Sequence, residues 1–195
     1  MSAQEMAGGA GVALNLIEWL VSEGCDALDD AGLVAELGSR ANALGLPVDR
    51  LTLHLRTLHP EIFARTIAWA PGEPAEVRDR SHGVLNAKIF VGSPLRQVME
   101  SGAHKVVRAD GTQPWLDIDV FKDRRLVEFV MLPLISASGP DSAICFATRS
   151  GQGFTADQIA MMDRIAPALR SICELRSLRQ AEIDVVAAIS GNAKE

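Results

Sequence analysis

The amino-acid sequence predicts an α+β domain, in which a mostly antiparallel sheet carries the N- and C-terminal helices on one face and a short helix with loops on the other. Three observations predict this class. Apolar residues recur with a period of about 3.6 near the N-terminus, and again over more than 25 residues near the C-terminus. Between these ends the period changes to 2, in short segments that turns separate. One helical segment interrupts the strands, so helices and strands do not alternate regularly.

The bulk composition is that of a globular protein, and it argues against two classes of partner. The chain has 195 residues and a formal net charge of −6. Because phosphate binding needs a basic face, we expect no nucleic-acid partner. The longest apolar runs are far shorter than a membrane span, so we expect no membrane partner. The three widely spaced cysteines, without a CxxC motif, are typical of free thiols in the reducing cytoplasm.

The N-terminal part is predicted to be helical after a disordered start. Residues 1–10 are small and polar, and we expect them to be disordered. Apolar residues at helical spacing predict a first helix over Val12–Ser22. A second helix is predicted over Asp29–Ala43, because an aspartate at 29 or 30 can cap its start and Gly45 follows its end.

Three strands are predicted next, over Asp49–Leu58, Ile62–Trp69 and Glu76–Arg80. Pro60 separates the first two, because proline cannot donate a hydrogen bond to a neighbouring strand. The charges of the third strand place it at an edge of the sheet. In the first strand, alternation puts two sets of side chains on opposite faces. The apolar set is Leu51, Leu53 and Leu55, and the other set is Thr52, His54 and Arg56.

The second half places strands around a short helix. Ser93 is a favourable N-cap, Pro94 suits the first helical position, and Gly102 follows the end of this helix. Three strands are predicted after it, over His104–Arg108, Val127–Ser136 and Ala143–Thr148. The middle one is apolar on both faces, which indicates a buried central strand. The segment before it is irregular, with one helical turn near Asp119–Arg124.

A long C-terminal helix is predicted to begin after Thr155, with Gln158 completing a capping box. Pro167 lies inside it and should kink the helix or loosen one turn. Its apolar stripe includes Met162, Ile165, Leu169, Ile172, Leu175 and Leu178. This stripe is longer than one small sheet can cover. We therefore expect a partner helix, either Val12–Ser22 or the same helix of a second subunit.

Several motifs, in order, resemble one known domain. They are "GLPVDRLTLHLRTLHPEIFARTIAW", "GSPLRQVMESG", "MLPL" and "FATRSGQGFTADQIAMMDRIAPAL", followed by "LRSLR". Together they resemble the GAF-like domain upstream of the catalytic domain in a group of bacterial class III adenylate/guanylate cyclases, from about Gly38 to Arg179. The resemblance implies a GAF/PAS-like fold over residues 11–180, a sensory or regulatory role, and a homodimer formed by the terminal helices. It also implies that residues 181–195 are the helix end or hinge leading to a cyclase catalytic domain.

The same resemblance implies that a ligand lies on the sheet face away from the terminal helices. Strand alternation directs His54 and Arg56 to that face, and it directs His59 to the opposite one, where we expect it to bond locally. Aromatic and histidine side chains in or near the segments that would roof a pocket there are Trp69, His82, Phe90, Trp115 and Phe121. They either line a pocket for an unknown small molecule or fill it as a core, because aromatic side chains bury well.

We expect no catalytic residue, metal site or cofactor. The carboxylates at 117, 119, 123 and 128 lack the turn glycine and the terminal bidentate glutamate of a calcium loop. The cysteines are too scattered for the redox set of a GAF-fold sulfoxide reductase. Nothing resembles the cyclase metal-binding aspartates, so we expect this chain not to be an enzyme. Two alternatives to a cyclase regulatory domain are a stand-alone module without a ligand and a small redox or hydrolytic enzyme.

Overall fold

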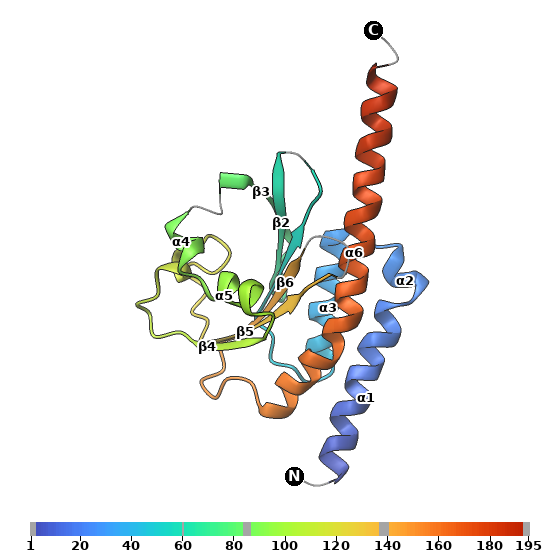
Figure 1. Ribbon diagram of the computed structural model, residues 1–195. Coiled ribbons are helices and arrows are strands. Elements are labelled where there is room, and N and C mark those ends of the chain that lie inside the picture. The colour runs from blue at the N-terminus through green and yellow to red at the C-terminus, as the bar shows by residue number, and fades with distance from the viewer. Residues whose placement is uncertain (1–2, 60, 84–86, 137–140, 193–195) are drawn as a thin grey trace.

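The computed structural model (Figure 1) describes residues 3–59, 61–83, 87–136 and 141–192. Within these residues the strands form one six-stranded sheet in the order β3-β2-β1-β6-β5-β4, and every neighbouring pair is antiparallel. The strands are β1 (Arg50–Arg56), β2 (Ile62–Trp69), β3 (Glu76–Ser81), β4 (Lys105–Arg108), β5 (Glu128–Leu134) and β6 (Ser142–Thr148). The predicted antiparallel sheet is confirmed, with β3 at an edge and β5 and β6 buried inside it.

The helices cover the two faces of the sheet as predicted. They are α1 (Ala3–Leu20), α2 (Glu23–Asp26), α3 (Asp30–Ala43), α4 (Lys88–Val91), α5 (Pro94–Ser101) and α6 (Ala156–Asn192), with a 3-10 turn η2 (Pro114–Asp117). Figure 1 shows α1, α3 and α6 on one side of the sheet, and α4 and α5 on the other. None of the helices in the described part of the chain is both long and apolar enough to cross a membrane.

Two apolar cores lie on opposite faces of the sheet, because side chains alternate along each strand. Leu51, Leu53 and Leu55 of β1 are buried in the larger core, against the terminal helices. The smaller core lies on the other face, where the rings of Trp115, Phe121 and Phe129 pack edge to face with centroids 4.9–6.0 Å apart. The sheet therefore separates the helices at the chain ends from the segments that could hold a ligand.

Trp69 lies in the helix-side core, so its predicted place in the pocket roof is wrong. It pairs with Leu51 in the antiparallel register and therefore shares the face of that residue. A Cβ at Gly38 of α3 would lie 2.2 Å from the Trp69 ring. Only glycine lets the α3 backbone approach the ring this closely.

Several predicted boundaries need correction. α1 begins at Ala3, so helix replaces the disorder predicted for residues 3–10. Extending an existing helix adds one hydrogen bond per residue, and alanine favours this extension. The helical turn predicted near Asp119–Arg124 is present, because the Lys122 N–H donates to the Ile118 carbonyl at 2.9 Å, and the 3-10 turn η2 precedes it. Residues 1–2, Pro60 and residues 193–195, which also carried predictions, lie outside the described residues.

α6 divides into a covered part and an exposed part. Met162, Ile165 and Leu169 are buried in the chain's own core, where α1 packs against α6. Of the two partners expected for the stripe, the N-terminal helix is therefore the one that covers this half, and these three residues do not belong to a dimer stripe. Ile172 packs at the margin of the same core, whereas Leu175 and Leu178 are exposed.

The start and the length of α6 agree with the sequence signals. The Gln158 amide N–H donates to Thr155 Oγ1, and the Thr155 N–H donates to Gln158 Oε1, which confirms the capping box. The helix continues across Pro167 and through Asn192. The described part of the predicted hinge is therefore helical, and Figure 1 shows this end of α6 extending past the rest of the molecule.

Candidate ligand cavity

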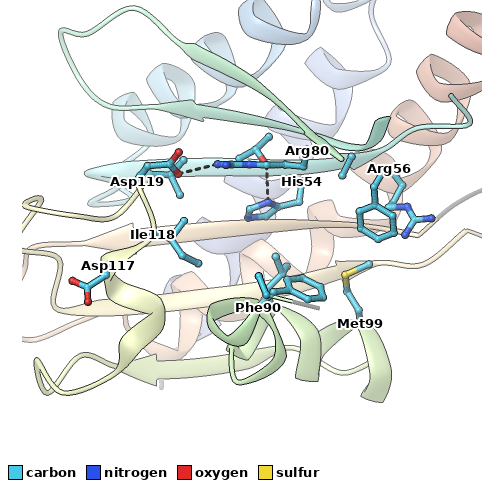
Figure 2. Close-up of a pocket in the computed structure, with 14 residues that line it drawn as sticks. His54, Arg56, Arg80, Phe90, Met99, Asp117, Ile118 and Asp119 are labelled. Carbon is cyan, nitrogen blue, oxygen red and sulfur yellow. Dashed lines mark hydrogen bonds and ion pairs between the residues drawn. The ribbon is translucent and has the colours of Figure 1, made fainter. Parts of the chain in front are cut away.

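A cavity of about 380 Å³ lies on the sheet face opposite the terminal helices. Figure 2 shows it between β1 and β2 on one side and α5 on the other, with β3 and the 117–120 loop at one end. Its lining residues are His54, Arg56, Phe63, Ala64, Thr66, Arg80, Ala87, Phe90, Leu95, Met99, Asp117, Ile118, Asp119 and Val120. Most of these side chains are apolar, as in the small-molecule sites of many proteins.

Local sequence signals place both walls of the cavity. The alternation of β1 directs His54 and Arg56 to the cavity, opposite the core leucines. On the other wall, Ser93 Oγ caps α5 by accepting the Arg96 N–H, and Gly102 ends the helix in a left-handed conformation. This short, sharply bounded helix presents Leu95 and other apolar residues to the sheet.

A buried arginine supports the 117–120 loop. The Arg50 side chain, only 1% exposed, reaches from the start of β1 to this loop, and its Nε donates to the Val120 carbonyl at 2.9 Å. At the same loop, Asp119 accepts a hydrogen bond from Arg80 of β3 at 2.8 Å and is also paired with Arg78. The loop is therefore tied to both β1 and β3, which keeps this end of the cavity in place.

His54 is a neutral polar group in the middle of the cavity. Burial, with a smaller contribution from the Arg80 charge, lowers the pKa of its imidazole to about 4. Its Nδ1 lies 3.4 Å from Thr66 Oγ1 on β2, the contact drawn in Figure 2. At neutral pH this residue can offer a hydrogen bond to a ligand without a charge.

The depressed pKa of His54 predicts a pH-dependent stability. Between pH 6.5 and about 4 the unfolded imidazole binds a proton that the folded one does not, so the free energy of unfolding falls as the pH falls through this window. We expect His54→Gln to remove about 2 kcal/mol of the decrease between pH 7 and pH 5. Urea unfolding at the two pH values measures this difference. His82→Gln, at an exposed site, should keep the full decrease, and an unchanged decrease in His54→Gln would contradict the assignment.

Arg56 is the one cation lining the cavity that has no ion pair among the described residues. Its guanidinium carbon lies 3.5 Å from the centroid of the Phe63 ring, a cation–π contact. Its Nε is buried without a hydrogen-bond partner. Burial lowers the pKa of the guanidinium, which the more distant charge of Asp141 partly offsets. The side chain therefore remains a cation whose hydrogen-bonding capacity is incompletely used.

The structure brings only part of the predicted site together. His54, Arg56 and Phe90 line the cavity. The exposed His82 packs edge to face on Phe63, with ring centroids 5.6 Å apart. Trp115 and Phe121 belong to the smaller core, on the face of the sheet away from the terminal helices, and they do not line the cavity. That outcome is the core-filling alternative for these two aromatic residues.

Sequence reasoning missed most of the cavity wall. Thr66 could have been placed through the alternation of β2, which puts it on one face with Ala64. Phe63 could not, because it lies three residues from Thr66 and reaches the cavity where the register of β2 shifts between Ile62 and Ala64. Leu95 and Met99 follow from helical spacing in α5, which places residues four apart on one face. No sequence signal indicates the pairing of Arg80 with Asp119, because 39 residues separate them.

The other residues singled out in the sequence have structural roles. The ring of His59 accepts the Glu61 and Ile62 N–H groups through Nδ1, as expected for local bonding. The three cysteines are free and buried, and burial raises the pKa of each thiol, for Cys173 to about 12. Cys25 and Cys173 belong to the helix-side core and Cys145 to the other. Thiols in this state are poor nucleophiles, which disfavours the redox alternative.

In the part of the chain that the structure describes, no three His, Cys, Asp or Glu side chains are grouped to hold a metal ion. Asp117, the first of the acidic residues considered as ligands, is exposed at the end of the cavity away from Arg56 in Figure 2. Asp119 is occupied by its two arginine partners. The chemistry available in the cavity is thus one neutral imidazole beside the Thr66 hydroxyl, one unpaired cation, the Asp117 carboxylate at the far end and an apolar wall.

Solved structures of several proteins have the same fold. The GAF domain of a phosphoenolpyruvate-protein phosphotransferase from Coxiella burnetii is similar with a TM-score of 0.55 and 14% identity, over 89% of this chain and 98% of that one. The free methionine-R-sulfoxide reductase from Neisseria meningitidis, solved with its substrate, gives a TM-score of 0.58 and 12% identity over 93% and 96%. The phycocyanobilin-bound GAF domain of a cyanobacterial phytochrome gives 0.57 and 10% over 86% and 96%.

The chain therefore has the GAF fold, and the predicted fold class is confirmed. At these identities the likeness extends to the fold alone. The sequence matches no protein-family model, and no curated protein matches it.

Proposed function

We propose that this chain is a cytoplasmic sensory domain that binds a small molecule in the cavity and regulates a class III adenylate cyclase catalytic domain through α6. The observation that carries the proposal is a direct hydrogen bond between the cavity strand β1 and α6. The cyclase assignment rests on the ordered motifs from Gly38 to Arg179, which resemble the domain upstream of that catalytic domain. The GAF fold is consistent with both parts of the proposal.

The route from the cavity to α6 passes through the backbone of Arg56. Pairing of β1 with β6 ends at His54, so Arg56 lies just past the end of this ladder. Its N–H donates to Ser142 Oγ at 3.1 Å, and its carbonyl accepts a hydrogen bond from Ser177 Oγ of α6 at 2.8 Å. The same residue therefore exposes its side chain to the cavity and binds α6 through its carbonyl. A ligand that moves Arg56 would move the contact with α6.

Arg176, the residue before Ser177, fixes α6 against the N-terminal part of the domain. Arg176 donates to the carboxylate of Asp30 at 3.1 Å and to the Cys25 and Leu28 carbonyls at 3.1 and 2.8 Å. Its side chain is only 13% exposed, so these bonds are little weakened by solvent. Arg176 therefore holds one side of α6 in place. Movement of Ser177 would rotate or tilt α6 and would not separate it from the domain.

On both sides of this anchor, α6 carries the exposed apolar residues that we propose form a homodimer. Leu175, Leu178, Val185 and Ile189 are exposed, and their spacing of 3, 7 and 4 fits a heptad repeat with Glu182 at the remaining position. A parallel pair of α6 helices would bury these residues and bring together the two catalytic domains that follow. The class III active site, by the resemblance, forms between two subunits.

Insertions into α6 test whether it carries the signal. We expect a chimera of residues 1–192 and a class III catalytic domain to change its rate of cyclic AMP formation severalfold when one residue is inserted after Gln180. One residue rotates the following helix by about 100°, whereas seven residues restore the heptad register. The seven-residue insertion should therefore keep the rate of the parent chimera. Equal rates for all three proteins would show that α6 is only a tether.

A further inference from the structure

We propose that the cavity binds a small molecule with an apolar body and a single carboxylate, and that Arg56 binds the carboxylate. This inference rests on the proposed function, since it takes the cavity as a ligand site and names the class of ligand. It follows from three features of the cavity: the character of its wall, the balance of its charges and the orientation of Arg56.

The wall selects an apolar body. The roof of the cavity is formed by Phe90, Leu95 and Met99, and the floor by Ala64 and Phe63. A hydrocarbon or aromatic group of a ligand would be buried between these apolar side chains, which is favourable. The polar groups in the middle are the neutral His54 and its neighbour Thr66, which together suit one hydroxyl or carbonyl of a ligand. A sugar or a polyphosphate would leave many of its polar groups without partners there.

The charges select a single anionic group. Arg80 is paired with Asp119 at 2.8 Å, so this cation is already compensated. Arg56 has no carboxylate within 4.0 Å among the described residues, and its Nε has no acceptor. Asp117 lies at the end of the cavity opposite Arg56 in Figure 2, where its carboxylate would repel a second anionic group.

The orientation of Arg56 suits a carboxylate. The face of its guanidinium is stacked on the Phe63 ring, which holds the planar group in one orientation and leaves its edge for hydrogen bonds. A guanidinium edge matches the two oxygens of a carboxylate in a bidentate pair. Arg56 is half-buried at one end of the cavity, so a carboxylate bound there would keep part of its contact with water while the apolar body enters the cavity.

Matched acids and amides test the inference without requiring any variant. We expect at least one of phenylacetate, 1-naphthaleneacetate and 4-biphenylacetate to bind about tenfold more tightly than its own primary amide, because only the acid forms the charged pair. Protein labelled with 13C in the methionine methyl groups reports the site of binding. Met99 lines the cavity, whereas Met161 and Met162 lie in the opposite core and serve as internal controls.

Substitutions then assign the preference to Arg56. Arg56→Gln should weaken acid binding to the level of the amide without changing amide binding, and Arg56→Lys should retain part of the preference. Arg96→Gln, an exposed arginine of α5 that pairs with Glu100, is the matched control and should behave as the wild type. Circular dichroism and thermal unfolding show whether each variant is folded, and a full preference for the acid in folded Arg56→Gln would overturn the assignment.

The binding results separate this inference from the proposed function. Equal binding of acid and amide at Met99 would overturn the carboxylate inference and leave the cavity as a ligand site. If none of the six compounds shifts the Met99 methyl resonance, the inference fails together with the ligand-binding part of the proposed function. An acid preference that shifts Met161 but not Met99 would also overturn the inference, since it places the acid elsewhere.

Discussion

Leu178→Glu combined with Val185→Glu should convert the protein from a dimer to a monomer. Both side chains are exposed in the single chain, and both fall on the proposed heptad seam of α6. In a parallel pair each glutamate would lie close to its own copy in an apolar interface, so charge repulsion and desolvation would oppose association. We expect the dissociation constant to rise by at least about a hundredfold, which sedimentation equilibrium can measure.

Two exposed valines outside α6 provide the control for this experiment. Val91 of α4 and Val106 of β4 have exposed fractions similar to that of Leu178, but one lies across the sheet from α6 and the other on an edge strand. Val91→Glu with Val106→Glu adds the same charge outside the seam of α6. This control should remain dimeric. A monomeric wild type at micromolar concentration, or a dimer that survives both glutamates on α6, would remove α6 from the interface.

Ser177→Ala should weaken the connection between the cavity strand β1 and α6. The Ser177 side chain is 4% exposed, and its hydroxyl bonds the Arg56 carbonyl just past the end of the β1–β6 ladder. Alanine would leave this part-buried carbonyl without that donor, at a cost of about 1–2 kcal/mol in the free energy of unfolding. We expect urea unfolding to show this loss, and hydrogen exchange to show weaker protection of the amides around 177.

Another serine of the same helix is the matched control. Ser171 is exposed on α6 and its hydroxyl bonds the Pro167 carbonyl within the helix. Ser171→Ala therefore removes a hydroxyl from α6 without touching the cavity strand, and it should change stability by less than about 0.5 kcal/mol. If the two alanine variants have the same stability and the same hydrogen exchange, the Ser177 contact does not connect β1 to α6.

Much of the fold could be predicted from the sequence because its signals are local. The bounds of β2 agree with the prediction, and the caps of α5 and α6 form with the residues expected. Caps and alternation depend on residues within one turn or one strand of each other. The start of α1 was misjudged because small residues give a weak signal, although alanine favours helix extension.

The candidate site was predictable only where alternation alone decides the face. His54 and Arg56 were placed correctly because β1 has a clean apolar side. Trp69 was misplaced because β2 is buried on both faces, so its orientation depends on the long-range register with β1. The sequence leaves the partner of the α6 stripe open between the N-terminal helix and a second subunit, because helical spacing does not distinguish residues covered by α1 from residues left exposed.

The most direct test of the central claim is the response of the cyclase chimera to an acid that shifts Met99. Cyclic AMP formation is measured with and without this acid, for the chimera and for its Ser177→Ala variant, while the Met99 resonance confirms that the cavity of each protein is occupied. We expect a severalfold change in the rate of the parent chimera and little or no change in the variant. An occupied cavity that leaves the rate of the parent chimera unchanged would contradict the claim that α6 reports the state of the cavity.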